Sequence, residues 1–304
     1  MSLFPLTDRE ILISVAGRTD RGMKRSENQD DFLVIDLTPG AASLVLRPEN
    51  QATSDGRRDL RLGQKGALMM VADGMGGGAA GGLASRLATL WVHQELIAAW
   101  GPERGNTPER FATCMRDAVS RANARIHQQA ADNSEFRGMG TTATVAGVLD
   151  GFLYLAQVGD SRAYLVRAGE ATQITRDQSF VQAMVDAGTL TEEEAEQSER
   201  RSVILQALGP KPEVSIELTY HEVRRGDVMV LCSDGLTRLV KRDEIAAIVA
   251  RNDPVGACTA LIRAANERGG PDNITVVIAQ LDGDGLEPPS GDDAVERRTL
   301  HLPA

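Results

Sequence analysis

The sequence has few of the residue types that several classes of protein depend on. Among 304 residues only three are cysteine, four are histidine and 4% are aromatic. Cys114, Cys232 and Cys258 are far apart and form no CxxC pair, so we expect no disulfide framework and predict reduced, buried thiols. The histidines show neither HExxH nor triad spacing, which argues against histidine catalysis.

Long apolar runs are also absent, and basic residues are in the minority. No stretch approaches the roughly 20 apolar residues of a membrane span, and the first twenty residues do not have the basic-then-apolar form of a signal peptide. The chain has 33 Lys and Arg against 43 Asp and Glu, a net charge of −10. This charge disfavours nonspecific binding to nucleic acid or an anionic membrane. We therefore expect a cytoplasmic monomer with neither as a partner.

Many short runs rich in Val, Ile, Leu and Tyr are present, and they predict strands. They include 11–17, 31–37 and a meander over 141–170 whose close turns imply antiparallel pairing. Apolar residues at helical spacing predict helices at 83–100, 108–131, 242–251 and 254–268. We predict an α+β fold, a four-layer α-β-β-α sandwich of two antiparallel sheets flanked by helices.

Three polar segments interrupt this pattern. Residues 38–65 are expected to form an exposed surface insertion, a hairpin with a candidate strand at 43–46. Residues 176–210 are mostly helical and polar. Residues 282–304 are predicted to be a flexible acidic tail. Residues 1–281, which include the first two of these segments, are assigned to one domain.

Five aspartates each lie where an apolar run begins or ends, although they are spread over most of the chain: Asp30, Asp73, Asp160, Asp234 and Asp272. A folded sheet can bring strand ends together at one rim. Carboxylates gathered there would repel each other and raise each other's pKa values unless cations neutralise them. Ligands that are all oxygen select hard ions such as Mg²⁺ and Mn²⁺. The pattern predicts a metal site.

Six short blocks, five of which contain one of these aspartates, follow one another in order: RSENQD (25–30), DGMGG (73–77), GTTAT (140–144), VGDSR (158–162), CSDGL (232–236) and GGPDNIT (269–275). Each block alone is weak, since Asp-Gly is a common turn. Together they resemble the metal-dependent protein phosphatase family, in particular the bacterial type 2C serine/threonine phosphatases. The resemblance covers about residues 11–281 and implies a dinuclear centre at one edge of the sandwich.

The resemblance implies a set of metal ligands. Asp73 would bridge two Mn²⁺ or Mg²⁺ ions, and the carbonyl of Gly74 would bind one of them. Asp234 and Asp272 would hold the other ion. Asp160 together with Asp234 would form a third, weaker site. Two cations bridged by a carboxylate can activate a water for attack on phosphorus, so no protein nucleophile is needed.

The same resemblance implies further roles around the metals. Asp30 would act from their outer shell through water, with Asn273 beside it, and Arg25 would bind the substrate phosphate with its planar fork. Arg25, Asp30 and Asp73 would be the catalytic residues. The expected activity is hydrolysis of phosphoserine and phosphothreonine on proteins, opposing a serine/threonine kinase. Residues 176–210 would form a flap.

The sequence departs from the family pattern at several positions, and two other functions remain open. Met75 stands where many eukaryotic members have a histidine; Gln29, Gly78 and Gln178 also differ from residues found in some members. These changes bear on substrate positioning more than on the metals. A regulatory module without turnover is disfavoured because all five aspartates and Arg25 are present. A two-metal phosphodiesterase for nucleic acid is opposed by the acidic charge.

Overall fold

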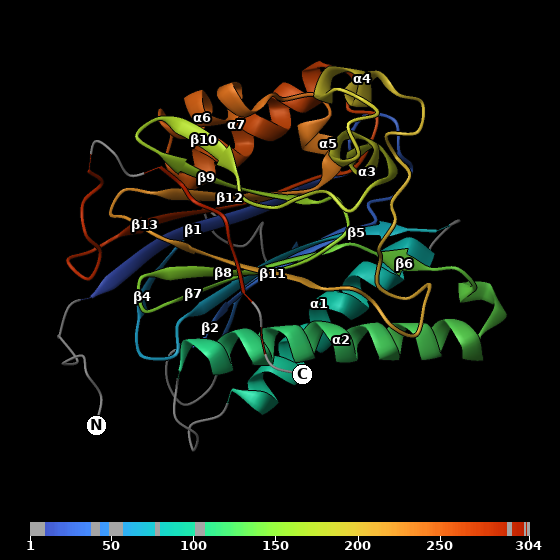
Figure 1. Ribbon diagram of the computed structural model, residues 1–304, viewed down its shortest axis with the longest axis horizontal. Coiled ribbons are helices and arrows are strands. Elements are labelled where there is room, and N and C mark those ends of the chain that lie inside the picture. Colours follow the sequence, from blue (N-terminus) through green and yellow to red (C-terminus); the bar gives the residue numbers. More distant parts are fainter. Residues whose placement is uncertain are drawn as a thin grey trace.

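Two antiparallel β-sheets stack face to face, and helices cover the outer face of each (Figure 1). The structure is a computed structural model that describes residues 10–37, 43–48, 57–76, 80–100, 107–290, 294–300 and 302. This arrangement confirms the four-layer α-β-β-α sandwich expected from the strand meander and the amphipathic helices.

The first sheet runs in the order β10-β9-β12-β13-β1-β4, and the pairs within it are antiparallel. Successive side chains of a strand point to opposite faces of the sheet, so two consecutive residues pack into different cores. Val15 packs between the sheets, whereas Ala16 faces the helices. Its strands are β1 (Ile11–Asp20), β4 (Arg57–Leu62), β9 (Arg162–Arg167), β10 (Glu170–Gln173), β12 (Val228–Cys232) and β13 (Ile274–Asp282).

The second sheet runs in the order β14-β11-β8-β7-β5-β2-β3, with the short β6 paired to the end of β5. Its pairs are also antiparallel. Its strands are β2 (Asp30–Asp36), β3 (Ser43–Leu46), β5 (Ala67–Met75), β6 (Gly140–Thr141), β7 (Ala143–Leu149), β8 (Phe152–Val158), β11 (Glu217–Glu222) and β14 (Arg298–Thr299).

Helices α1 (Ala80–Ala99) and α2 (Pro108–Asp132) cover the second sheet, and α6 (Arg242–Val249) and α7 (Pro254–Glu267) cover the first (Figure 1). Three short helices lie at one end of the sandwich: α3 (Phe180–Asp186), α4 (Glu192–Gln197) and the single turn α5 (Asp234–Thr237). The 3₁₀ turn η2 (Ser134–Phe136) follows α2. The described helices include none that is long and apolar enough to cross a membrane.

Three apolar cores separate the four layers. One lies between the second sheet and α1 and α2, and includes Phe111 and Met115. The middle core lies between the sheets and includes Phe32 and Met69. The third packs α6 and α7 against the first sheet. Because both faces of each sheet are covered, the central strands are apolar on both faces, which is why they appear in the sequence as nearly unbroken apolar runs.

The expectation of a hairpin insertion over residues 38–65 is wrong for the parts that the structure describes. β3 pairs with β2 at an edge of the second sheet, whereas β4 pairs with β1 at an edge of the first. Leu46 and Leu60 are buried in the middle core. The segment therefore connects the two sheets, and Leu46 in β3 and Leu60 in β4 hold it by packing into the core between them. Residues 38–42 and 49–56 lie outside the described residues.

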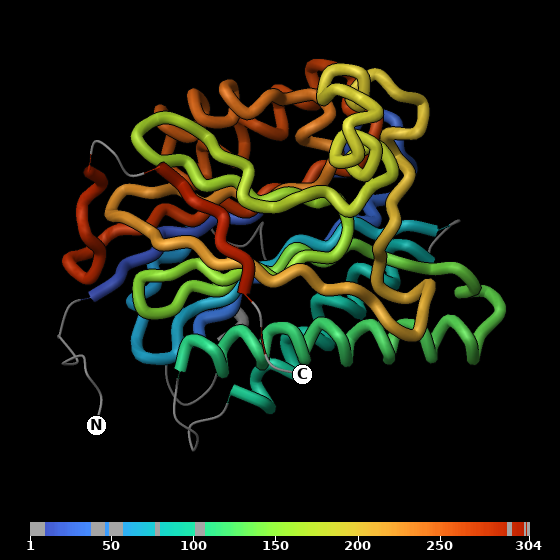
Figure 2. Tube along the Cα trace, in the orientation of Figure 1, coloured from blue at the N-terminus to red at the C-terminus, as the bar shows by residue number. Residues whose placement is uncertain are grey.

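The segment predicted as a flexible tail, residues 282–304, is packed on the sandwich over its described parts. Leu286 is buried in the middle core. β14 pairs with β11, and the carbonyl oxygen of Glu296 lies 2.8 Å from Nδ1 of His221. Figure 2 shows the C-terminal trace, in red, returning across the edges of the two sheets. The chain thus covers the exposed backbone of β11, which a flexible tail would leave unpaired.

Candidate metal centre

The five aspartates predicted from the sequence gather at one rim of the sandwich, since the charges of the other four all act on Asp73. The elements β5, β6 and α5, which meet at this rim, are labelled on the right of Figure 1. Adjacent antiparallel strands end and begin at the same edge. Asp30 begins β2 and lies directly opposite Asp73 near the end of β5. In the other sheet, β12 ends at Cys232, two residues before Asp234, and pairs there with the beginning of β13, which follows Asp272.

Asp30 connects the two sheets at this rim. Its Oδ2 accepts hydrogen bonds from the hydroxyls of Ser233 and Thr275, each at 2.7 Å, which belong to the first sheet's side of the rim. Its Oδ1 is buried without a hydrogen-bond partner. Burial raises the pKa of Asp30 to about 7, and the charges of Asp234 and Asp272 add to this rise. One carboxylate oxygen is therefore fixed and the other is available.

Asp73 lies at the centre of the cluster. Burial raises its pKa well above the usual range, and the charges of the other four aspartates raise it further. Two threonines hold its backbone: Oγ1 of Thr142 accepts from the Asp73 N–H at 2.9 Å, and Oγ1 of Thr141 donates to its carbonyl at 3.0 Å. The GTTAT block thus fixes the strand end that carries the aspartate.

Glycine follows two of the aspartates because the backbone packs too closely there for a side chain. A Cβ on Gly74 would lie 2.2 Å from the carbonyl oxygen of Gly81 in α1. A Cβ on Gly235 would lie 1.9 Å from the carbonyl oxygen of Asn273. Heavy atoms cannot approach so closely, so both glycines are required to bring α1, α5 and the β13 loop together at the rim.

Asn273 organises the loop that carries Arg25. Its Nδ2 donates to the carbonyls of Arg21 and Glu27, each at 2.9 Å, and its Oδ1 accepts from the Gln29 N–H at 2.8 Å. Arg25 Nη2 then donates to Asp272 Oδ2 at 2.8 Å. The Arg25 side chain is 52% exposed. It can therefore reach both the carboxylates and a ligand arriving from solvent.

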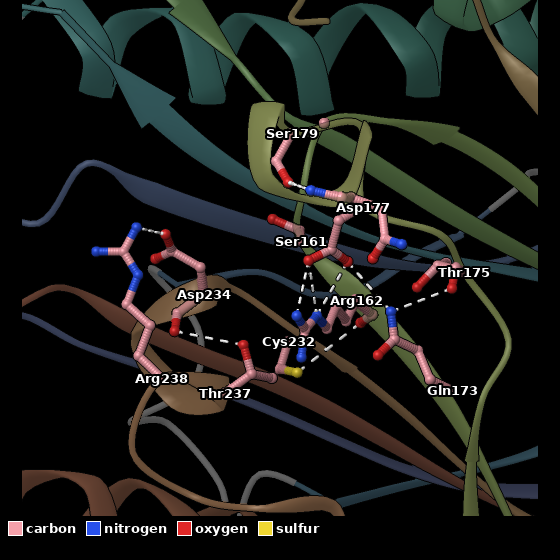
Figure 3. Close-up of polar contacts among 12 residues, drawn as sticks. Ser161, Arg162, Gln173, Thr175, Asp177, Ser179, Cys232, Asp234, Thr237 and Arg238 are labelled. Carbon is pink, nitrogen blue, oxygen red and sulfur yellow. Dashed lines mark hydrogen bonds and ion pairs between the residues drawn. The ribbon is translucent and has the colours of Figure 1, made fainter. Parts of the chain in front are cut away.

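Asp160 follows β8 in a turn that is clamped from residues 176–210. Oε1 of Gln178 accepts from the Gly159 N–H at 2.9 Å, and the Gln178 N–H donates to the Gly159 carbonyl. Oδ1 of Asp160 is buried without a partner. Burial raises the pKa of Asp160 to about 8, and the charges of Asp234 and Asp177 contribute. In Figure 3, Arg162 points to Asp177, which it binds through both Nε and Nη2.

Arg238 was not among the residues predicted for the site. It lies one helical turn after Asp234, and its Nη2 donates to Asp234 Oδ2 (Figure 3). Its Nη1 lies 3.8 Å from Asp272 Oδ2. The available signal was its spacing, because residues four apart on a helix are neighbours and Asp234 begins α5.

The residues at the rim fit a site for divalent cations. Asp30, Asp160 and Asp234 each have a buried Oδ1 without a hydrogen-bond partner in the structure, and such oxygens require a cation, a proton or water. The donors are carboxylates and carbonyls, which suit Mg²⁺ and Mn²⁺. Among the described residues no group of three or more acidic, histidine or cysteine side chains is arranged to hold a metal ion by itself. Arg25 and Arg238 pair with Asp272 and Asp234 there.

Comparison with known proteins gives one consistent result. The sequence profile of the family described as "Protein phosphatase 2C" matches residues 50–264. The protein phosphatase PhpP of Streptococcus pneumoniae is 34% identical over 88% of this chain and 98% of its own length. The serine/threonine protein phosphatase PstP of Mycobacterium tuberculosis is 36% identical, but the chain spans only 45% of its length.

Solved structures agree in fold as well as in sequence. A crystal structure of the Mycobacterium tuberculosis serine/threonine phosphatase PstP/Ppp has a TM-score of 0.71, with 36% identity over 89% of this chain and 99% of that chain. The catalytic domain of PstP in complex with two manganese ions has a TM-score of 0.68, with 34% identity over 90% of this chain and 99% of that chain. The chain therefore belongs to the protein phosphatase 2C family, whose members are metal-dependent hydrolases.

Proposed function

We propose that this chain is a serine/threonine protein phosphatase that hydrolyses phosphoserine and phosphothreonine by direct attack of water on phosphorus, with two Mn²⁺ or Mg²⁺ ions. The observation that carries the proposal is the rim itself, where five aspartates, three with a buried Oδ1 that lacks a partner, lie beside a half-exposed arginine. The names of the relatives, serine/threonine phosphatases from several bacteria, support the same activity.

The two cations would be held by Asp73, the carbonyl of Gly74, Asp234 and Asp272. When bound, they lower the pKa of the attacking water and neutralise charge on the phosphoryl oxygens. The PstP structure in complex with two manganese ions supports this number. The third, weaker ion expected at Asp160 and Asp234 is not carried into the proposal, because Arg238 already pairs with Asp234.

Asp30 would orient the attacking water. Its Oδ2 accepts from Ser233 and Thr275, which fixes the carboxylate plane. Its unpartnered Oδ1 is then free to accept a hydrogen bond from that water. It could so hold the proton released as the new O–P bond forms and the ester O–P bond breaks, while the departing serine or threonine oxygen takes a proton from solvent. Asn273 would act indirectly, because its three hydrogen bonds fix the loop that leads to Asp30 and Arg25.

Arg25 would bind the phosphate of the substrate. The guanidinium presents paired N–H groups that match two phosphate oxygens. In the structure it pairs with Asp272, a contact that it would exchange for the phosphate once cations neutralise that carboxylate. Its exposed side chain makes it accessible to a phosphorylated residue on a protein surface.

The cysteines offer no competing nucleophile. All three are buried, and none forms a disulfide with another described residue. Burial raises the pKa of Cys232 and of Cys258 to about 12, so neither thiol ionises near neutral pH. A thiolate is the reactive form of cysteine, so a cysteinyl-phosphate intermediate is disfavoured and direct attack by water is favoured.

The proposed partners are phosphoproteins, among them a serine/threonine kinase whose action the chain would reverse. Residues 176–210 would act as a flap that governs access of these proteins, since Gln178 ties the base of the segment to the Asp160 turn. We further propose that the chain is a cytoplasmic monomer that binds neither nucleic acid nor membrane. The net charge of −10 and three cysteines that form no disulfide among the described residues support this part.

The test is an assay of the purified chain with Mn²⁺ on a phosphothreonine peptide and, in parallel, on a nucleotide diester. We expect release of phosphate from the peptide, loss of that activity with a chelator, and its recovery when Mn²⁺ is restored. Hydrolysis of the diester alone would identify a phosphodiesterase instead. Tight Mn²⁺ binding with neither activity would identify a regulatory module.

A further inference from the structure

The third cation expected at Asp160 and Asp234 would share its position with a guanidinium. Arg238 closes the single turn α5, four residues after Asp234, and contacts Asp234 Oδ2. The same guanidinium lies 3.8 Å from Asp272 Oδ2. Its side chain is 25% exposed and that of Asp234 12%, so the pair lies at the inner part of the rim, where solvent screening is weak.

We infer that Arg238 replaces the third divalent cation, so that the chain binds two such ions and Arg238 supplies the remaining positive charge. This inference rests on the two-cation centre of the proposed function. It assigns a role to a residue that follows the CSDGL block and that sequence patterns alone did not select.

The coordination available to Asp234 supports this assignment. A carboxylate has two oxygens: Oδ1 of Asp234 is buried and unpartnered, whereas Oδ2 accepts from Arg238. Oδ1 suffices for the dinuclear centre. A third ion would need Oδ2 as well. Without it, Asp160 would be left to hold that ion, since the nearby Asp177 is already paired with Arg162. One carboxylate and several waters hold a divalent cation weakly.

Electrostatics lead to the same conclusion. The five aspartates carry five negative charges, and two divalent cations with Arg25 and Arg238 would already supply six positive ones. A third dication would lie beside a guanidinium that stays protonated at any working pH. The nearby carboxylate of Asp177 does not relieve this repulsion, because it is already paired with Arg162. Arg238 would supply its positive charge at any concentration of free metal, since the helical spacing of four residues keeps it next to Asp234.

The experiment measures Mn²⁺ stoichiometry and affinity by titration with electron paramagnetic resonance of the free ion, independently of turnover. Wild type is expected to bind two ions, and Arg238→Lys, which keeps the charge, also two. Arg238→Gln is expected to bind a third ion more weakly than the first two, and Arg238→Gln/Asp160→Asn to lose it again. Arg238→Met serves as a second neutral variant, and thermal unfolding confirms that each variant folds.

Three tightly or weakly bound ions in wild type would overturn the inference, and so would a folded neutral variant that still binds only two. If wild type binds no Mn²⁺, the two-cation centre itself is wrong and the inference falls with it. A phosphatase assay separates the two cases, because an active wild type with three ions refutes only the role of Arg238. Saturation of wild-type activity at two bound ions agrees with the inference.

Discussion

At the scale of single residues, the rim divides the two oxygens of its carboxylates between protein donors and a ligand. Oδ2 of Asp30 accepts hydrogen bonds from two hydroxyls, whereas its buried Oδ1 has no hydrogen-bond partner. Oδ2 of Asp234 accepts a hydrogen bond from Arg238, and its Oδ1 likewise has no hydrogen-bond partner. Fixing one oxygen orients the other, which is how surrounding residues orient metal ligands. These hydrogen bonds would therefore preorganise the rim for the proposed cations.

Asp73→Asn tests the carboxylate at the centre of this cluster. The neutral amide keeps the size of the side chain but removes the charge that would hold two cations. We expect kcat on a phosphothreonine peptide to fall by about three orders of magnitude or more, since metal activation contributes several kcal/mol. Asp59→Asn, at a 67% exposed side chain on β4, is the matched control and should keep wild-type turnover. Near-native kcat in Asp73→Asn would rule out the mechanism.

Arg25→Ala tests phosphate recognition separately from metal binding. Hydrogen bonds to a charged group contribute about 2 kcal/mol, which corresponds to a loss of about 30-fold in kcat/KM for a phosphopeptide. The exposed position of Arg25 favours the lower part of the known range. Arg25→Lys should recover part of the loss because it restores charge without the planar fork. Calorimetry should give unchanged Mn²⁺ affinity; lost Mn²⁺ binding with unaltered kinetics would contradict this role.

At the scale of elements, the site depends on strand ends and short helices that pack backbone against backbone. α5 begins at Asp234 and approaches Asn273 so closely that Gly235 has no room for a Cβ. α1 begins next to Gly74, and there the backbones of Gly74 and Gly81 also lie too close together for a Cβ on Gly74. The rim thus brings together segments far apart in the sequence through contacts that only glycine permits.

Gly235→Ala tests this close packing. The added methyl would displace the β13 loop and should lower the free energy of unfolding by about 1–3 kcal/mol, measured by urea titration with a chelator present. Gly82→Ala in the first turn of α1 is the control, since its Cβ would meet the flexible end of Arg86 at 3.3 Å and the backbone of Asn28 and Gln29 at 3.6 Å, an ordinary contact distance. Alanine there should be neutral or stabilising by up to about 1 kcal/mol. Equal stability of Gly235→Ala and wild type would show that the loop adapts freely.

At the scale of the whole molecule, much of the fold and most of the site could be predicted from the sequence. The strand runs, the paired helices and the strand-end aspartates were readable because both faces of each sheet are covered and antiparallel strand ends share an edge. Asp30 and Asp73 are the clearest case, since each borders an apolar run and the two lie directly opposite each other.

What could not be predicted depends on isolated contacts. Leu46 ends the short apolar run 43–46, and Leu60 and Leu286 lie among charged and polar residues. Nothing in these short patterns indicated that the three leucines anchor the connection between the sheets and the C-terminal segment in the middle core. Arg238 was missed because an arginine after a short turn is usually solvated. Its contact with Asp234 arises only because α5 is helical, which places residues four apart on the same face. Tertiary packing decides such positions, and sequence periodicity does not report it.

The acidic rim should also make the stability of the whole molecule depend on pH and on metal. In the folded state the pKa of Asp30 is raised to about 7 and that of Asp160 to about 8, while Asp73 shifts in the same direction. Between about pH 4 and pH 8 the folded chain therefore binds more protons than the unfolded chain. Stability with a chelator is then highest at low pH within this window and falls as pH rises through these values.

Mn²⁺ should reverse this trend, because cations bind carboxylates only after the proton has left. Each site filled at 100 times its Kd adds about 2.7 kcal/mol to the free energy of unfolding. We expect the increase in Tm produced by Mn²⁺ over chelator to be small at pH 5 and clearly larger at pH 8, as calorimetry can measure. Asp73→Asn should lose most of the increase at pH 8. An increase equal at both pH values, or larger at pH 5, would mean that these carboxylates do not bind the metal.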